Sequence, residues 1–409
     1  MRTRSKLAAG LAAALTLSPS LEGQSTIRDS AGIRIVDNVR AAWPAGRAWS
    51  IATPPLVDIG SGEDSLYELS TVMGAVRLSD GSIAVANMGS SNIRVYDPRG
   101  RFVRAIGRRG QGPGEFRQVM GLARRPGDTL VVVDSREELE YFTADGRFVR
   151  GLRSPSHRDG LVISDFHLFA DGSFARTSWP QGHHRTEDRW LDSLVVVHVT
   201  PADTMGRIIS RHPAIEYTRR PAYPGALPVQ YGPAGFIVPD GDGYYVAYGV
   251  RYEIRRHRLD GSLERMIRAP WTPVPVRASD REAYRQFLTG LGAEGGGPVD
   301  PRLAAQRLRL LEATEFARHL PAYQQLIVDR ERNVWVSEAQ AERFVTQGFA
   351  RVPSAPTPWR VFDRQGIWLG TVTMPARFRP MDIGREFVLG LWRDADDVEH
   401  VRLYRLDRP

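Results

Sequence analysis

The chain has 409 residues, of which 42% are hydrophobic, so it is long enough to bury a substantial core. Its formal net charge is +8, but the arginines are scattered among acidic residues, a pattern that argues against a nucleic-acid-binding stripe. Cysteine is absent and Lys6 is the only lysine, so the rest of the chain has no thiolate nucleophile, Schiff-base lysine, phosphate-loop lysine or cysteine-ligated metal.

The first 23 residues have the pattern of a secretory signal peptide. Three basic residues precede the short apolar run Leu7–Leu17, and small residues follow it. This run is too short to span a bilayer, and no later segment is long and apolar enough to do so. A buried N-terminal helix is the alternative. We expect residues 1–23 to be a signal peptide, residues 24–409 to form the folded domain, and the protein to be periplasmic or secreted.

A sequence repeat made of short predicted strands occurs six times. Its members alternate bulky β-forming residues with small or polar ones, and glycine follows a polar residue where tight hairpins need positive φ. Gly100 and Gly146 occupy the same place in the first two copies, and a period of roughly 45 residues is typical of propeller blades. We therefore predict an all-β fold, a six-bladed β-propeller. The copies begin near Asp80, Gly127, Asp171, Gly241, Arg332 and Gly384.

The sixth copy lacks its last strand. Two strand-like segments, Gly32–Val36 and Trp49–Gly60, precede the first copy. We expect one of them to complete the sixth blade and close the ring, because closure removes the open sheet edges that invite aggregation.

The segment Gly107–Phe116, with the sequence GRRGQGPGEF, joins the first two copies. Its central glycines are expected to turn the chain, Glu115 to cap backbone amides, and Phe116 to fill the space between two blades. The segment resembles the inter-blade segment of NHL-repeat proteins and of an uncharacterised bacterial family of six-bladed β-propellers. The resemblance is good over Trp49–Leu152 and absent over the helical segment described next. It implies the fold and the number of blades, and little about activity.

Residues 277–321 interrupt the strand pattern with a predicted helical hairpin. The sequence Ser279–Glu282 is a capping box, and apolar residues at helical spacing follow it. Asp300-Pro301 is expected to begin a second helix that Pro321 ends. Long insertions of this kind are commonly functional or face a partner.

Three groups of polar residues are candidates for metal binding. His183-His184 lies near two acidic residues, and Asp394–His400 offers oxygen ligands that calcium prefers. The alternatives are a solvated loop and a polar hairpin tip. Asn87 and Asp134 end matching strands, and propellers of the gluconolactonase type carry metal ligands of these kinds near the axis. The alternative for this pair is a bond to the local backbone.

Residues 212–233 are rich in proline, tyrosine and arginine. Together with the helical hairpin they could wall a pocket over the propeller axis, suited to a sugar, peptide or acidic ligand. A packed surface loop is the alternative. The candidate binding residues are Tyr217, Arg219, Arg220, Tyr223, Tyr231, Tyr284, His183 and His184.

The sequence favours an exported binding or interaction module of the cell envelope, whose partner is an unidentified envelope protein, peptide or glycan. It indicates no catalytic motif, no cofactor, no nucleic acid and no membrane span. The alternative is a metal-dependent hydrolase or lyase of the lactonase type, with a divalent metal in the axial channel. Histidine or carboxylate side chains that converge at the channel mouth would favour the enzyme. An apolar or arginine-lined channel would favour the binding module.

Overall fold

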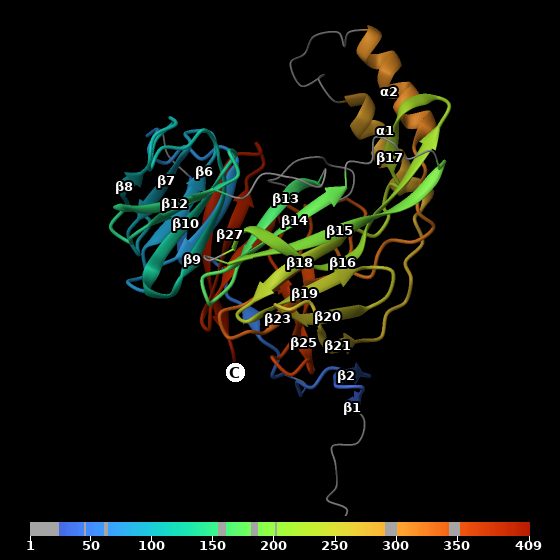
Figure 1. Ribbon diagram of the computed structural model, residues 1–409, viewed down its shortest axis with the longest axis horizontal. Helices are drawn as coiled ribbons and strands as arrows, with labels where there is room; N and C mark the ends of the chain where they lie inside the picture. The colour runs from blue at the N-terminus through green and yellow to red at the C-terminus, as the bar shows by residue number, and fades with distance from the viewer. Residues whose placement is uncertain are drawn as a thin grey trace, which may run out of the picture.

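The strands of the protein form six sheets arranged around a ring (Figure 1). The computed structural model describes residues 24–44, 46–60, 64–153, 161–180, 187–200, 203–290, 301–342 and 352–409, with the side chains of 161–165, 178–180 and 203–205 left out. Blade one contains β5 (Val72–Arg77), β6 (Ile83–Asn87), β7 (Asn92–Tyr96) and β8 (Phe102–Ile106). Blade two contains β9 (Val119–Arg125), β10 (Thr129–Asp134), β11 (Glu138–Phe142) and β12 (Phe148–Arg153), with a short 3-10 turn at Pro126–Asp128.

Blades three and four are larger. Blade three contains β13 (Leu161–Leu168), β14 (Phe174–Pro180), β15 (Arg189–Thr200), β16 (Asp203–Arg220) and β17 (Tyr223–Pro228). Blade four contains β18 (Gly235–Asp240), β19 (Gly243–Tyr248), β20 (Glu253–Arg258) and β21 (Leu263–Arg268), extended by β2 (Ile33–Asn38) and β1 (Ser25–Ser30).

Blades five and six complete the ring. Blade five contains β22 (Gln325–Val328), β23 (Val334–Ser337), β24 (Thr357–Phe362) and β25 (Trp368–Met374). Blade six contains β26 (Phe378–Ile383), β27 (Phe387–Arg393), β28 (Glu399–Asp407), β4 (Val57–Ile59) and β3 (Ser50–Ile51). The predicted six-bladed β-propeller is confirmed.

Burial follows the position of a strand within its blade. Every residue of β6 is buried, because this middle strand is covered on both faces by the neighbouring blades. In the outer strand β8 only Ile106 is fully buried. The first strands of adjacent blades approach one another around the axis: a Cβ added at Gly74 in β5 would lie 3.1 Å from the Leu122 Cβ in β9.

The ring is closed by residues from the two ends of the described chain. In β4, Val57 pairs with Leu403 and Ile59 with Val401, antiparallel to β28. This confirms that Trp49–Gly60 completes blade six. Glu399 adds a second connection, because its carboxylate accepts a 2.7 Å hydrogen bond from the Val72 amide of blade one. The other predicted strand, β2, pairs in parallel with β21 at the outer edge of blade four.

The segment from β1 to β4 contacts three blades in succession. After β2, the Trp43 amide of this segment donates a 2.7 Å hydrogen bond to Leu369 O of blade five. The segment then joins blade six as β3 and β4. Asn38 joins blades four and five, since its Nδ2 donates to Arg268 O and Gly366 O, both at 3.0 Å. Its Oδ1 accepts a 2.8 Å bond from the Trp368 amide. We call residues 25–59 the N-terminal strap.

We predict that Asn38→Ala lowers the free energy of unfolding by about 3 kcal/mol, because it leaves buried backbone groups of two blades without partners. Urea denaturation followed by tryptophan fluorescence measures the change. Arg40→Ala, which truncates an exposed side chain in the same segment, is the control. Equal unfolding midpoints for Asn38→Ala and the wild type would contradict the bridging role.

The inter-blade segment folds as predicted. Glu115 accepts hydrogen bonds from the Gln111 and Gly112 amides at 3.2 and 3.0 Å, which confirms its capping role. Phe116 is completely buried between blades one and two. Gly107 has a φ of +71°, and a Cβ at that position would meet the Phe116 ring at 2.2 Å. The turn therefore depends on glycine for both backbone conformation and space.

The insertion forms the predicted helical hairpin, with α1 at Ala278–Gly290 and α2 at Pro301–Ala313. Two details of the prediction are wrong. Helix α1 begins one residue before the predicted capping box, and Asp280 accepts a 2.7 Å bond from the Arg277 amide. Helix α2 ends at Ala313 instead of continuing to Leu320, because the next residues pair with the propeller: the Leu320 amide donates to Val274 O at 2.8 Å.

Candidate functional site

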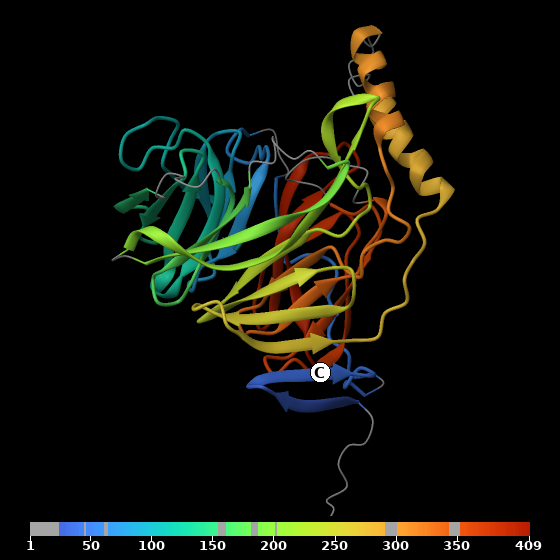
Figure 2. The ribbon, with the colours of Figure 1, turned by 45° about the vertical axis from the view of Figure 1, so that its right-hand side comes forward.

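The helical hairpin stands at the edge of blade three, beside the ends of β15, β16 and β17 and away from blades one and two (Figure 1, Figure 2). The prediction that residues 212–233 form a loop is wrong for most of that stretch, because β16 and β17 make an antiparallel hairpin that extends beyond the blade. The prediction that they wall a pocket over the axis is also wrong, since other residues line the channel.

The strand hairpin and the helical insertion are joined by main-chain and charged contacts. The Gln230 amide donates to Glu315 O at 2.8 Å, and the Ala317 amide donates to Gln230 O at 2.9 Å. The Glu315 carboxylate also accepts hydrogen bonds from Arg189 and Arg220. Arg220, a predicted binding residue, thus has a structural ion pair.

Two other predicted binding residues belong to the buried base of the insertion. Tyr231 is 1% exposed, and its hydroxyl donates a 2.5 Å hydrogen bond to Asp280 O. Its ring stacks on Phe316 at 5.8 Å, and Tyr284 packs edge-on against the same ring at 5.6 Å. Burial raises the pKa of Tyr231 to about 12. These tyrosines hold the insertion in place and do not face a ligand.

Tyr217 and Arg219 of β16 pack against Trp190 of β15. The Tyr217 ring stacks on Trp190 with 5.6 Å between centroids and 17° between planes. The Arg219 guanidinium lies over the same indole at 5.6 Å. Tyr223 lines an open groove. His183 and His184 lie outside the described residues.

A groove of about 850 Å³ lies between the end of the strand hairpin and α2. We call it the rim groove. On α2 its lining residues recur at i, i+3, i+4 and i+7 from Arg302, so they share one helix face. This periodicity is visible in the sequence, but the tertiary contact that places β17 opposite it is not. The lining residues are Pro221, Ala222, Tyr223, Pro224, Pro301, Arg302, Ala305, Gln306 and Arg309.

The axial channel is a second cavity, of about 690 Å³, lined by residues from the first strands of five blades. Nine of its fifteen lining residues are apolar or glycine, and the six polar ones include two arginines (Arg124 and Arg379), two carboxylates and a histidine. Within the described part of the chain, no three His, Cys, Asp or Glu residues form a group that could hold a metal ion. The other lining residues are Met73, Met120, Gly121, Leu122, Ala123, Val133, Asp134, Ser135, Glu137, Phe166, His167, Leu168 and Pro239.

The predicted alternatives for Asn87 and Asp134 are decided by their hydrogen bonds. Asn87 Oδ1 accepts from the Ser70 amide at 3.0 Å. Asp134 accepts from the Gln118 amide at 3.2 Å and from the Arg136 amide at 2.8 Å. Both side chains therefore bind the local backbone.

The acidic turn is a polar hairpin tip. Asp394 Oδ1 accepts from the amides of Asp396 and Val398, both at 2.9 Å. His400 lies between this turn and the blade-closing residue Asp58: its Nδ1 is 2.7 Å from an Asp58 oxygen and its Nε2 is 3.8 Å from an Asp394 oxygen. Among the described residues, the acidic side chains of this turn do not form a group of three that could hold a metal ion.

A buried pair of histidines lies between blades three and four, close to the extended strands. The His212 and His257 rings are 4.8 Å apart. His212 Nε2 is 2.8 Å from the Ser210 hydroxyl, which is also 2.8 Å from the Tyr244 hydroxyl. Burial, with a smaller contribution from His257 and Arg255, lowers the pKa of His212 to about 4. Burial lowers the pKa of His257 as well.

The pair makes folding stability dependent on pH. Both histidines are neutral in the folded state, whereas an unfolded histidine takes up a proton near pH 6.5, so stability is complete above that pH and falls as the pH drops towards 4. We predict a loss of about 3 kcal/mol from His212 over this range. His212→Gln should flatten the profile of unfolding free energy against pH, measured by urea titration. Exposed His319→Gln is the control, and identical profiles for all three proteins would refute the prediction.

Comparison with known proteins agrees with this architecture. A family model described as a 6-bladed beta-propeller matches residues 68–162. The chain resembles this uncharacterised propeller family. The match covers blade one, the inter-blade segment and blade two, where the sequence repeat is most regular. A search of curated protein sequences finds no match.

Solved structures also resemble the propeller. A Bacteroides vulgatus protein of the duf4221 family aligns with a TM-score of 0.52 at 10% identity, covering 89% of this chain and 99% of that one. A Bacteroides fragilis protein aligns with a TM-score of 0.48 at 13% identity, covering 92% and 99%. A Xanthomonas campestris gluconolactonase has a TM-score of 0.40 at 14% identity, covering 89% and 99%. At these identities the likeness concerns the fold alone. In the described part of the propeller, neither helix has the length and apolarity needed to cross a bilayer.

Proposed function

We propose that the protein is a non-catalytic binding module that holds an acidic peptide segment in the rim groove. The observation that carries this proposal is the composition of the groove. Of the nine described residues that line it, two are arginines, six are apolar and none is acidic. A groove with only positive charges attracts a negatively charged ligand. Its apolar part is a favourable place to bury apolar side chains of that ligand.

The shape of the groove favours an extended peptide over a compact ligand. Tyr223 and three prolines (Pro221, Pro224 and Pro301) present flat, stiff surfaces that lose little conformational entropy on binding. The two walls come from a strand hairpin and a helix that are tied together by Glu315 and by the buried base around Tyr231. The groove is therefore preorganised.

The cellular context of the proposal rests on the sequence. The basic and apolar pattern of residues 1–23 supports export, with residues 24–409 as the exported domain. An acidic segment of an envelope protein is then the partner class that suits the groove. At the axial channel, Asp134 is bound to two backbone amides and to Arg136, and no three potential metal ligands of the described residues form a group. This supports a binding module over a metal-dependent hydrolase.

The test is a fluorescence anisotropy titration with a labelled short peptide in which glutamates alternate with prolines and leucines. We expect saturable binding that weakens with added salt, since part of the attraction is between exposed charges. The double variant Arg302→Glu, Arg309→Glu should weaken binding about tenfold or more, because both groove cations become repulsive. Tyr223→Ala should weaken it to a smaller extent.

Arg285→Glu provides a matched control, because it reverses a charge on the same insertion outside the groove. A peptide with lysine in place of glutamate tests the sign of the charge. Equal affinity of the double variant and the wild type, or equal binding of the lysine peptide, would rule out the rim groove as an acidic-peptide site.

A further inference from the structure

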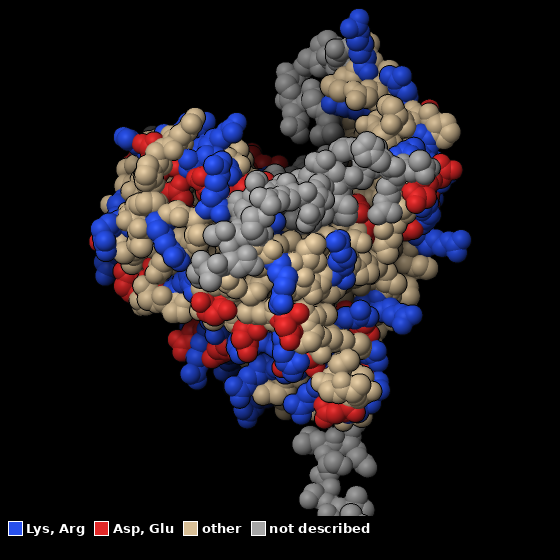
Figure 3. All heavy atoms as spheres, in the orientation of Figure 1, with Lys and Arg blue, Asp and Glu red and all other residues tan. Residues whose placement is uncertain are grey.

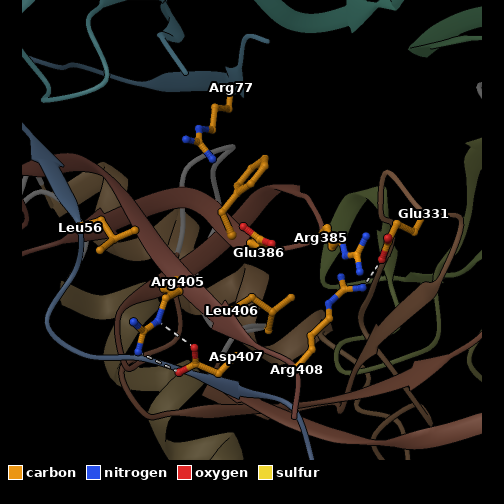
Figure 4. Close-up of a pocket in the computed structure, with 10 residues that line it drawn as sticks. Leu56, Arg77, Glu331, Arg385, Glu386, Arg405, Leu406, Asp407 and Arg408 are labelled. Atoms are coloured by element: carbon orange, nitrogen blue, oxygen red, sulfur yellow. Dashed lines mark hydrogen bonds and ion pairs between the residues drawn. The ribbon is translucent and has the colours of Figure 1, made fainter. Parts of the chain in front are cut away.

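A third cavity, of about 800 Å³, lies where blades one, five and six meet, and it is rich in arginine (Figure 4). We call it the arginine groove. It is remote in sequence from the rim groove, and it receives residues from β5, from the turns after β22 and β26, and from the end of β28. The lining residues are Leu56, Arg77, Glu331, Arg385, Glu386, Phe387, Arg405, Leu406, Asp407 and Arg408.

One buried carboxylate organises this groove. Asp382 accepts a 2.9 Å hydrogen bond from the Arg77 amide, and it binds the Arg330 guanidinium through both of its oxygens. Arg330 in turn donates to Arg77 O. Both the amide and the carbonyl group of Arg77 are therefore hydrogen-bonded. These bonds fix the position of the backbone from which the Arg77 side chain extends.

Two guanidinium groups flank the Phe387 ring. The Cζ atom of Arg77 is 5.0 Å from the ring centroid, and that of Arg330 is 5.1 Å from it. Arg330 is committed to Asp382, whereas Arg77 extends into the groove (Figure 4). Cation–π contact of this kind orients a guanidinium without consuming its hydrogen-bond donors. The ring thus supports Arg77 in a position where its Nη groups, which have no hydrogen-bond partner among the described residues, line the groove.

The charges of the groove do not cancel locally. Arg405 pairs with Asp407 at 2.7 Å, and Arg408 pairs with Glu331. In the part of the chain that the structure describes, no carboxylate lies within ion-pair distance of the Arg77 or Arg385 guanidinium, and the buried Arg77 Nε has no hydrogen-bond partner. Two cations with unused donors and one acidic side chain, Glu386, therefore remain in the groove.

We propose that the arginine groove binds a doubly charged oxyanion of the phosphate class, with Arg77 as its ligand and Arg385 as a second cation that raises the positive potential of the groove (Figure 4). Planar guanidinium groups match the geometry of phosphate oxygens and form charge-assisted hydrogen bonds with them. Glu386 sets an upper limit on affinity, since its carboxylate repels the anion. This inference is independent of the rim groove and concerns a ligand of different chemistry.

The experiment is isothermal titration calorimetry of the full chain with inorganic phosphate, with sulfate as a second arm and sodium chloride at matched ionic strength as the blank. We expect saturable binding of phosphate or of both oxyanions. Arg77→Gln should weaken it about tenfold, the value of one charged hydrogen bond. Arg385→Gln should weaken it a few-fold, because it removes one positive charge from the groove. Glu386→Gln should strengthen binding a few-fold by removing the repulsion.

Arg99→Gln, which removes an exposed arginine outside the groove, should leave binding unchanged. Because Arg385 is exposed, its variant tests the proposal even if Arg77→Gln destabilises the fold. Two results would overturn the assignment: no saturable heat above the chloride blank, or the same affinity in Arg385→Gln and the wild type. The double variant Arg302→Glu, Arg309→Glu should keep its phosphate binding, so the two sites are tested separately.

Discussion

The fold depends on the pairing of residues 57–59 with residues 401–403. A propeller with an open blade would expose the edge of β28 and the apolar faces of blades one and six. The closing strand comes from the N-terminal side and the rest of blade six from the C-terminal side, so blade six is complete only when the ring closes. Glu399 reinforces this closure from inside, where its carboxylate holds the Val72 amide. The axial channel and the arginine groove depend on this closure, because each is lined by residues from several blades.

The blades are nearly uniform near the axis and differ at the periphery. The innermost strands are tied by close approaches such as that of Gly74 to Leu122, which leave little freedom for change. At the edge of blade three, by contrast, β15 and β16 lengthen and a helical hairpin packs against them through a cluster around Phe316. The rim groove also lies at this edge, between β17 and α2. The blades of this chain are thus alike where they pack around the axis and differ in length and in insertions at their outer edges.

The sequence was sufficient for features that depend on local chemistry. The spacing of Gly100 and Gly146, the cap by Glu115 and the burial of Phe116 all follow from short-range patterns, and the structure has them. Features set by long-range contacts were mispredicted. Residues 314–320 have helical periodicity, but their backbone pairs with Val274 and Gln230 instead. Tyr231 and Tyr284 resemble ligand-binding aromatics, but Phe316 buries them. The arginine groove could not be foreseen, since its residues come from positions more than 300 apart and converge only in the closed ring.

The N-terminal strap gives the propeller an asymmetry that its repeating blades do not suggest. Blades one, two and three meet their neighbours through packing and individual hydrogen bonds, such as that from the Val72 amide to Glu399. Blades four, five and six are also crossed by one segment that includes Asn38 and Trp43. Detachment of that segment would remove an edge strand from blade four, a bridge from blade five and the closing strand from blade six at once. Those three blades therefore form a single cooperative unit, and under force or denaturant this half of the ring should open in one step and not blade by blade.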